Sequence, residues 1–154
     1  MNRLIAIIMF CVFGVISAAY ADSIGTNKDI ENSEQGGAMY ISVRAKGNIT
    51  LFKLNNSQAA KALYDQLPLN VKAEPYSDNE MIFYPPEKLS TDHTPMANAK
   101  AGTLAYYAPW GDVVMFYKDF GSASGLYELG NSVSGGEHIS EMTGTLLVEK
   151  ASEP

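Results

Sequence analysis

Residues 102–117 decide the fold; they read Gly102-Thr-Leu-Ala-Tyr-Tyr-Ala-Pro-Trp-Gly-Asp-Val-Val-Met-Phe-Tyr117. Two runs rich in β-branched and aromatic residues, which favour strands, flank a Pro-Trp-Gly-Asp segment. Proline presets the φ angle of a turn and glycine tolerates a positive φ, so this segment predicts a tight turn. The stretch therefore predicts a hairpin with strands at 104–107 and 113–117, and Trp110, the only tryptophan of the chain, lies in its turn.

The sequence around this hairpin predicts further short strands and one helix. Ser57 is a suitable N-cap, and residues 58–67 are rich in Ala, Leu, Lys and Gln, so we expect a helix that Pro68 ends. Together with the hairpin, about eight short strands separated by turn signals indicate a mainly β protein, a closed barrel or a sandwich. The remaining strands are expected at 39–44, 49–54, 69–75, 80–84, 126–129 and 145–149.

Three further segments of the sequence carry specific structural expectations. Pro75 predicts that the strand at 69–75 lies at an edge, because proline cannot donate to a strand ladder. Residues 90–101 form the longest predicted loop, and loops of this length are often functional. Residues 130–136 are rich in glycine and serine and predict another loop, followed by a short helix at 137–142.

The first 21 residues predict an export signal. A short positive region at Arg3 precedes an apolar run over 4–16, and Ala19-Tyr20-Ala21 fits a cleavage site. The run is shorter than the about 20 residues of a membrane-spanning helix, so we expect no stable membrane anchor after cleavage. The expected organisation is a signal peptide at 1–21, a flexible polar spacer at 22–37, one domain at 38–150 and a tail at 151–154, in a protein exported to the periplasm or the medium.

Composition excludes several classes of function. The single cysteine, Cys11, lies within the predicted signal, so the exported chain has no disulfide, thiol nucleophile or thiolate metal site. The net charge is −6, with acids and bases interspersed, which argues against nucleic-acid binding. No phosphate loop, dinucleotide fingerprint, nucleophile elbow or zinc motif occurs. We therefore expect no cofactor and no metal, and assign no catalytic residue; the oligomeric state stays open.

The order of these features resembles the cyclophilin-like β-barrel family of small bacterial proteins, which is distinct from the true cyclophilins. That family has an Ala-rich helix ending in Leu-Pro, a Gly-Asp-Ile-x-Tyr-Tyr-x-Pro-Trp-Gly segment, a strand ending in Phe-Tyr and a late Leu-x-x-Leu-Gly. The matching residues are 59–69, 102–111, 116–117 and 126–130, with Thr103 in place of the family's aspartate. The resemblance covers about residues 39–149 and implies a small closed barrel of about eight strands, capped by the helix at 57–67.

The resemblance implies a fold and little chemistry, because this bacterial family has no well-established activity. True cyclophilins assist rotation about prolyl bonds with a strand arginine and a nearby Phe-Met-x-Gln pattern. Arg44 is the only arginine after the predicted signal, and Ala45-Lys46-Gly47 follows it instead. The chain is therefore expected to be non-enzymatic, with a divergent peptidyl-prolyl isomerase as the alternative.

The aromatic hairpin is the strongest candidate for a binding site. Trp110 is expected to project beside the barrel mouth, where its ring can stack on a ligand. The other candidate ligand-binding residues are Tyr106, Tyr107, Phe116 and Tyr117 on the two strands, and His93 in the long loop. The alternative is that the aromatic residues only pack across the strands and that His93 is simply solvated.

The leading hypothesis is an exported domain that binds a peptide or a small molecule through these aromatic residues. A structural or accessory partner in an envelope assembly remains a further alternative, with the hairpin surface as its interface.

Overall fold

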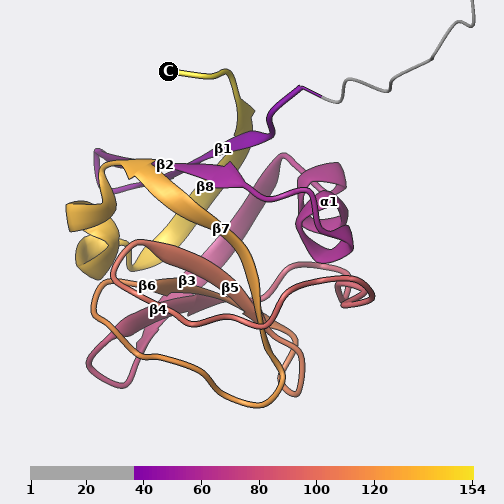
Figure 1. Cartoon of the computed structure of the whole chain (residues 1–154). Helices are drawn as coiled ribbons and strands as arrows, with labels where there is room; N and C mark the ends of the chain where they lie inside the picture. The colour runs from indigo at the N-terminus through magenta and orange to yellow at the C-terminus, as the bar shows by residue number, and fades with distance from the viewer. Residues whose placement is uncertain (1–36) are drawn as a thin grey trace, which may run out of the picture. The chain divides into compact units, whose positions relative to one another are not determined.

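The computed structural model describes residues 37–154, so the predicted signal peptide and residues 22–36 of the predicted spacer lie outside the described residues. Within 37–154, eight antiparallel strands close into a barrel in the order β1-β2-β7-β5-β6-β4-β3-β8 (Figure 1). The mainly β fold with a closed barrel and a short helix is thus confirmed. The strands are β1 (Tyr40–Ala45), β2 (Asn48–Leu54), β3 (Leu69–Tyr76), β4 (Glu80–Phe83), β5 (Thr103–Tyr107), β6 (Asp112–Phe116), β7 (Leu126–Ser134) and β8 (Gly144–Ala151).

The barrel interior is filled by apolar side chains. Successive residues of a strand point to opposite faces, so β6 sends Val113 and Met115 inward and Val114 and Phe116 outward. The inward residues belong to one buried cluster that also contains Ile41, Phe52, Phe83, Leu104, Leu129, Leu146 and Val148. The barrel therefore holds a packed core, and its ligand-accessible surfaces lie elsewhere.

One α-helix, α1 (Gln58–Asp65), packs against this core. The side chain of Ser57 accepts a hydrogen bond from the backbone N–H of Ala60 at 3.3 Å, as expected of an N-cap. Ala59, Ala60 and Leu63 are fully buried and belong to the main cluster, so one face of the helix is attached to the barrel by burial of apolar surface.

The structure differs from expectation in two strands. β7 continues to Ser134 through the predicted loop, because β2 pairs with it and passes so close to Gly130 that a Cβ there would overlap the carbonyl of Lys53. β3 is not a free edge, since it pairs with β8 over 69–73 and with β4 over 73–76. Pro75 lies in the part that pairs with β4 alone, where a missing donor is tolerated.

The predicted short helix is a 3-10 helix, η1 (Gly136–Glu141).

A second apolar cluster covers part of the outer surface of the barrel. It contains Ala97 and Ala99 from the loop before β5, which pack on outward residues of four strands. Backbone hydrogen bonds hold this cover in place: Ala97 N–H donates to Leu126 O at 2.9 Å and Ala99 N–H to Gly121 O at 2.7 Å. All five residues of β6 are consequently buried, although the strand forms the barrel wall.

Among the helices of residues 37–154, none combines the length and the apolar character that crossing a bilayer requires.

Candidate functional site

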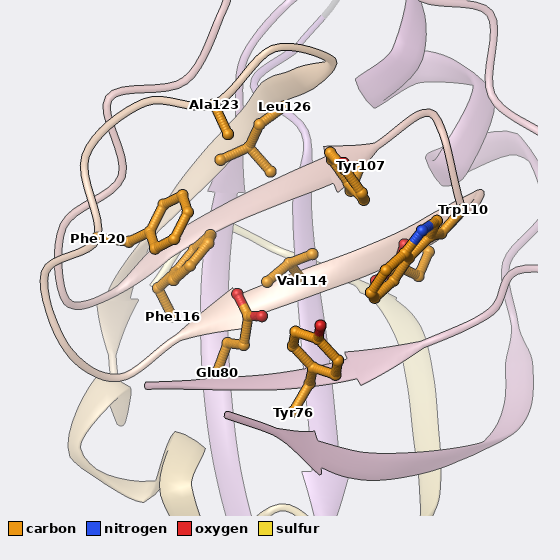
Figure 2. A pocket seen from close by; sticks show the side chains of 10 residues that line it. Tyr76, Glu80, Tyr107, Trp110, Val114, Phe116, Phe120, Ala123 and Leu126 are labelled. Atoms are coloured by element: carbon orange, nitrogen blue, oxygen red, sulfur yellow. The ribbon is translucent and has the colours of Figure 1, made fainter. Parts of the chain in front are cut away.

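A pocket of about 210 Å³ opens on the outer surface of the barrel, between the strands and the segment that follows β6. Figure 2 shows its side chains gathered over β6, with contributions from β3, β4, β5 and β7. It has an aromatic end, an apolar end and two carboxyl groups. The lining residues are Tyr76, Glu80, Tyr107, Trp110, Asp112, Val114, Phe116, Phe120, Ala123 and Leu126.

The turn between β5 and β6 places Trp110 at the aromatic end. The N–H groups of Trp110 and Gly111 both donate to Tyr107 O, at 3.2 and 2.8 Å. Gly111 has φ +79°, a conformation that glycine adopts without strain. The turn returns the chain so that Asp112 pairs with Tyr107, and the Trp110 ring meets the Tyr107 ring at 5.5 Å and 78°. The side chain of Trp110 remains half-exposed, at 49%.

Tyr76, the last residue of β3, forms the opposite wall of the aromatic end. Its ring centroid lies 5.1 Å from that of Trp110, with an angle of 85° between the rings. Edge-to-face contacts of this kind are favourable, each contributing about 1 kcal/mol beyond area burial. The three rings therefore form a corner, with Trp110 between the two tyrosines (Figure 2).

The apolar end is built from β6 and the segment that follows it. The ring of Phe116 is buried and stacks on that of Phe120, with centroids 5.3 Å apart and an angle of 24°. Val114, Ala123 and Leu126 complete this end of the pocket. Such a surface favours an apolar group of a ligand, because contact removes both surfaces from water.

Asp112 places a carboxyl group in this largely apolar setting. The residue is 2% exposed, and its Oδ1 has no hydrogen-bond partner in the described part of the chain. Burial raises the pKa of Asp112, and the residue's own backbone N–H offsets part of this effect. A buried polar atom without a partner is costly, so its presence in a pocket calls for an explanation.

Glu80 is the second carboxyl group of the pocket, at the start of β4. Burial raises the pKa of Glu80 to about 7, and the charge of Asp112 adds to this shift. Strongly shifted pKa values combined with a pocket are typical of functional sites. Near neutral pH, Glu80 is therefore divided between its neutral and ionised forms.

The structure brings three of the six predicted site residues to this pocket: Tyr107, Trp110 and Phe116. Tyr106 points into the barrel core, where its hydroxyl accepts a hydrogen bond from Leu89 N–H at 3.2 Å. Tyr117 packs against the main core cluster, and His93 is exposed in its loop with φ +51°. The pocket lies on the outer face of the barrel rather than at its mouth, because the interior is filled.

Sequence reasoning missed Tyr76, Glu80, Asp112 and Phe120. One signal was available for the two acids: each is the first residue of a strand whose other residues are all apolar. A strand without polar alternation is covered on both faces, so an acid at its start is expected to be at least partly buried. Tyr76 and Phe120 carried no such signal.

Other groups singled out in the sequence lie away from the pocket. Arg44 is half-exposed and forms an ion pair with Glu149 at 3.8 Å. Thr103, which replaces the aspartate of the resembled family, is buried; its hydroxyl accepts from Lys100 N–H and donates to Asn131 Oδ1. Within residues 37–154, no group of three His, Cys, Asp or Glu side chains is placed to hold a metal ion.

Comparison with known proteins identifies one family and one fold. The model of the Cyclophilin-like family matches residues 43–149. The solution structure of the hypothetical protein AF2241 from Archaeoglobus fulgidus superimposes with a TM-score of 0.59 at 20% sequence identity, over 77% of this chain and 99% of that one. At this identity the likeness shows the fold alone. A search of curated proteins found no match.

Proposed function

The chain belongs to the cyclophilin-like family, as the resemblance in its sequence implied, and we propose that it is an exported binding protein that holds its ligand in the pocket at Trp110. The ligand is a small molecule or one side chain of a peptide, since a volume of about 210 Å³ accommodates a group of that size.

The observation that supports this proposal most strongly is the half-exposed corner of three aromatic rings beside a buried carboxyl oxygen that has no hydrogen-bond partner among residues 37–154. Aromatic side chains that serve only to pack are normally covered, as Tyr106 is in the core. Trp110 and Tyr76 instead remain 49% and 45% exposed at the rim of a concavity. An apolar lining with a few polar groups is the usual composition of a ligand site.

The position of Arg44 does not favour the alternative of a prolyl isomerase. Its side chain pairs with Glu149 outside the pocket. A proline-peptide isomerisation assay remains a direct check: we expect no activity that Arg44→Ala removes.

The proposed function is tested by filling the pocket. Ala123 lines the pocket and is partly exposed, so Ala123→Phe extends a ring into it without removing a polar contact. Ala101→Phe, at an exposed position outside the pocket, is the matched control. A chemically diverse library of small molecules is screened against the wild-type protein by the fluorescence of Trp110, the sole tryptophan, and each binder is measured by calorimetry.

We expect binders whose affinity falls at least about tenfold in Ala123→Phe and is unchanged in Ala101→Phe. Binding that is equal in the two variants would place the ligand elsewhere and contradict the proposal. A library without a single binder to the wild-type protein would also contradict it.

A further inference from the structure

The two carboxyl groups of the pocket have no positively charged partner in the part of the chain that the structure describes. None of the four ion pairs among residues 37–154 includes Glu80 or Asp112. Burying an unpaired charge is costly, and a native protein normally pairs it or neutralises it. The charge of Asp112 also opposes the ionisation of Glu80 and so raises the pKa of Glu80. The missing positive charge is therefore a feature that a ligand can supply.

The aromatic corner fits the same kind of ligand. Ring faces carry negative electrostatic potential, and a cation over such a face gains about 0.5–2 kcal/mol, depending on how far it is desolvated. Because Tyr76 and Tyr107 each meet Trp110 nearly at a right angle, the corner offers ring faces in more than one orientation. Figure 2 shows Tyr76 between Trp110 and Glu80, with the carboxyl group of Glu80 directed toward Val114, next to Phe116.

We propose that the pocket recognises a small organic cation: an ammonium group on an apolar stem, with Asp112 and Glu80 as its counter-charges and the rings of Tyr76, Tyr107 and Trp110 around it. The stem lies over Val114 toward Phe120, Ala123 and Leu126, in the apolar end. This inference rests on the proposed function and names the ligand class that the same site takes.

The arrangement selects against other ligand classes. An anion would meet two carboxyl groups in a protein whose net charge is already −6. A hard metal cation requires several oxygen ligands arranged around it, and the described residues provide no group of three suitable side chains. A neutral ligand of the same shape would leave Asp112 Oδ1 buried without a charged partner.

Three matched probes test the inference: 2-phenylethylamine, the neutral 2-phenylethanol and the anionic phenylacetate. Each is titrated into the wild-type protein at pH 7.5 and followed by Trp110 fluorescence and calorimetry. We expect the amine to bind at least about tenfold more tightly than the alcohol, and phenylacetate to bind most weakly. Capped lysine amide, a fourth probe, separates a peptide lysine from a free amine as the natural source; tighter binding of either cation than of the alcohol supports the inference.

Two isosteric variants assign the charge preference to the pocket acids. Asp112→Asn should reduce the preference for amine over alcohol to less than about threefold, and Glu80→Gln should weaken amine binding without weakening alcohol binding. Asp65→Asn, which removes the same charge from an exposed side chain on α1 outside the pocket, should change neither. Circular dichroism verifies that each variant is folded.

The outcomes separate this inference from the proposed function. If the alcohol binds as tightly as the amine and Ala123→Phe blocks both, the pocket binds ligands but does not recognise cations, and the inference is wrong. If the amine preference persists unchanged in both Asp112→Asn and Glu80→Gln, the inference is also wrong. If no probe binds and the diverse library gives no binder either, the inference and the proposed function both fail.

Discussion

Trp110 meets Tyr76 edge-on, with ring centroids 5.1 Å apart and an angle of 85° between the rings. Trp110 belongs to the turn between β5 and β6, whereas Tyr76 ends β3, and these segments become neighbours because β4 pairs with both β3 and β6. Through this contact, Tyr76, which lies far from Trp110 in the sequence, orients the most exposed aromatic ring of the pocket. The aromatic end of the site thus depends on barrel closure.

Replacing Tyr76 with leucine should loosen this corner. Loss of one edge-to-face contact costs about 1 kcal/mol of interaction and leaves the Trp110 ring more exposed to water. We expect the Trp110 emission to shift to longer wavelength and the affinity for 2-phenylethylamine to fall about fivefold. Tyr84→Leu, which removes another half-exposed tyrosine outside the pocket, is the control. An unchanged spectrum in Tyr76→Leu would mean that Tyr76 does not position Trp110.

Tyr106 should behave as a core residue, although it is the neighbour of Tyr107. Tyr106→Phe leaves the buried N–H of Leu89 without its acceptor, which costs about 1–3 kcal/mol of unfolding free energy. Chemical denaturation measures this loss, and ligand affinity should remain as in the wild-type protein. Tyr107→Phe is the matched control for stability and should change it by less than about 0.5 kcal/mol. If Tyr106→Phe loses ligand binding while its stability is unchanged, Tyr106 is part of the binding site and this prediction is wrong.

Much of the fold could be predicted from local sequence. The hairpin of β5 and β6 follows from two strand-forming runs around a Pro-Trp-Gly-Asp turn, and α1 follows from Ser57 and the helix-forming residues after it. The extension of β7 could not be predicted, because Gly130 suits either a loop or a close approach to β2. Only the pairing with β2 decides between them.

The candidate site was predictable only in part. Tyr107 and Trp110 could be predicted as site residues because they are aromatic and lie near a turn. Tyr76 and Glu80, which also line the pocket, come from β3 and β4 and could not be predicted in this way. Which side chains meet across a barrel depends on strand order and register, here Ile82 opposite Val114, and local patterns do not contain this information. The same limit explains why the sequence suggested the mouth of the barrel rather than its covered outer face.

Glu80 should make the protein less stable as the pH rises. Burial raises the pKa of Glu80 to about 7 in the folded protein, against a reference value of 4.5, so between these values the folded state binds more protons than the unfolded state. The free energy of unfolding therefore falls from about pH 4.5 to pH 7 through this group. Glu80→Gln removes the effect and should stabilise the protein at pH 8. Because Glu80 is only partly buried, solvent screening reduces the full effect of the shift to roughly 2 kcal/mol.

Denaturant unfolding of the wild-type protein and of Glu80→Gln at pH 5 and pH 8 measures this difference. Glu74→Gln, which removes an exposed carboxyl group from the neighbouring strand β3, is the control. The other titratable groups lining the pocket, Asp112, Tyr76 and Tyr107, are the same in all three proteins. A Glu80→Gln variant that is less stable than the wild-type protein at pH 8 would contradict the assigned pKa shift.

Cation binding should strengthen over the same pH range. A permanently charged probe, phenyltrimethylammonium, does not titrate, so any pH dependence comes from the protein. If only the form with ionised Glu80 binds the cation, the affinity rises roughly tenfold from pH 6 to pH 8, because the pKa of Glu80 is about 7 in the free protein. Calorimetry at both pH values should show this rise in the wild-type protein and not in Glu80→Gln. A rise of equal size in Glu80→Gln would assign it to another group.

The most direct test of the account is a crystal structure of the protein with 2-(4-bromophenyl)ethylamine, whose position is located by the anomalous signal of its bromine. The account predicts the ammonium nitrogen within ion-pair distance of Asp112 Oδ1 and beside the Trp110 ring, with the bromine at the apolar end near Phe120 and Leu126. A ligand bound in the reverse orientation, with its nitrogen in solvent, or bound outside this pocket would contradict it.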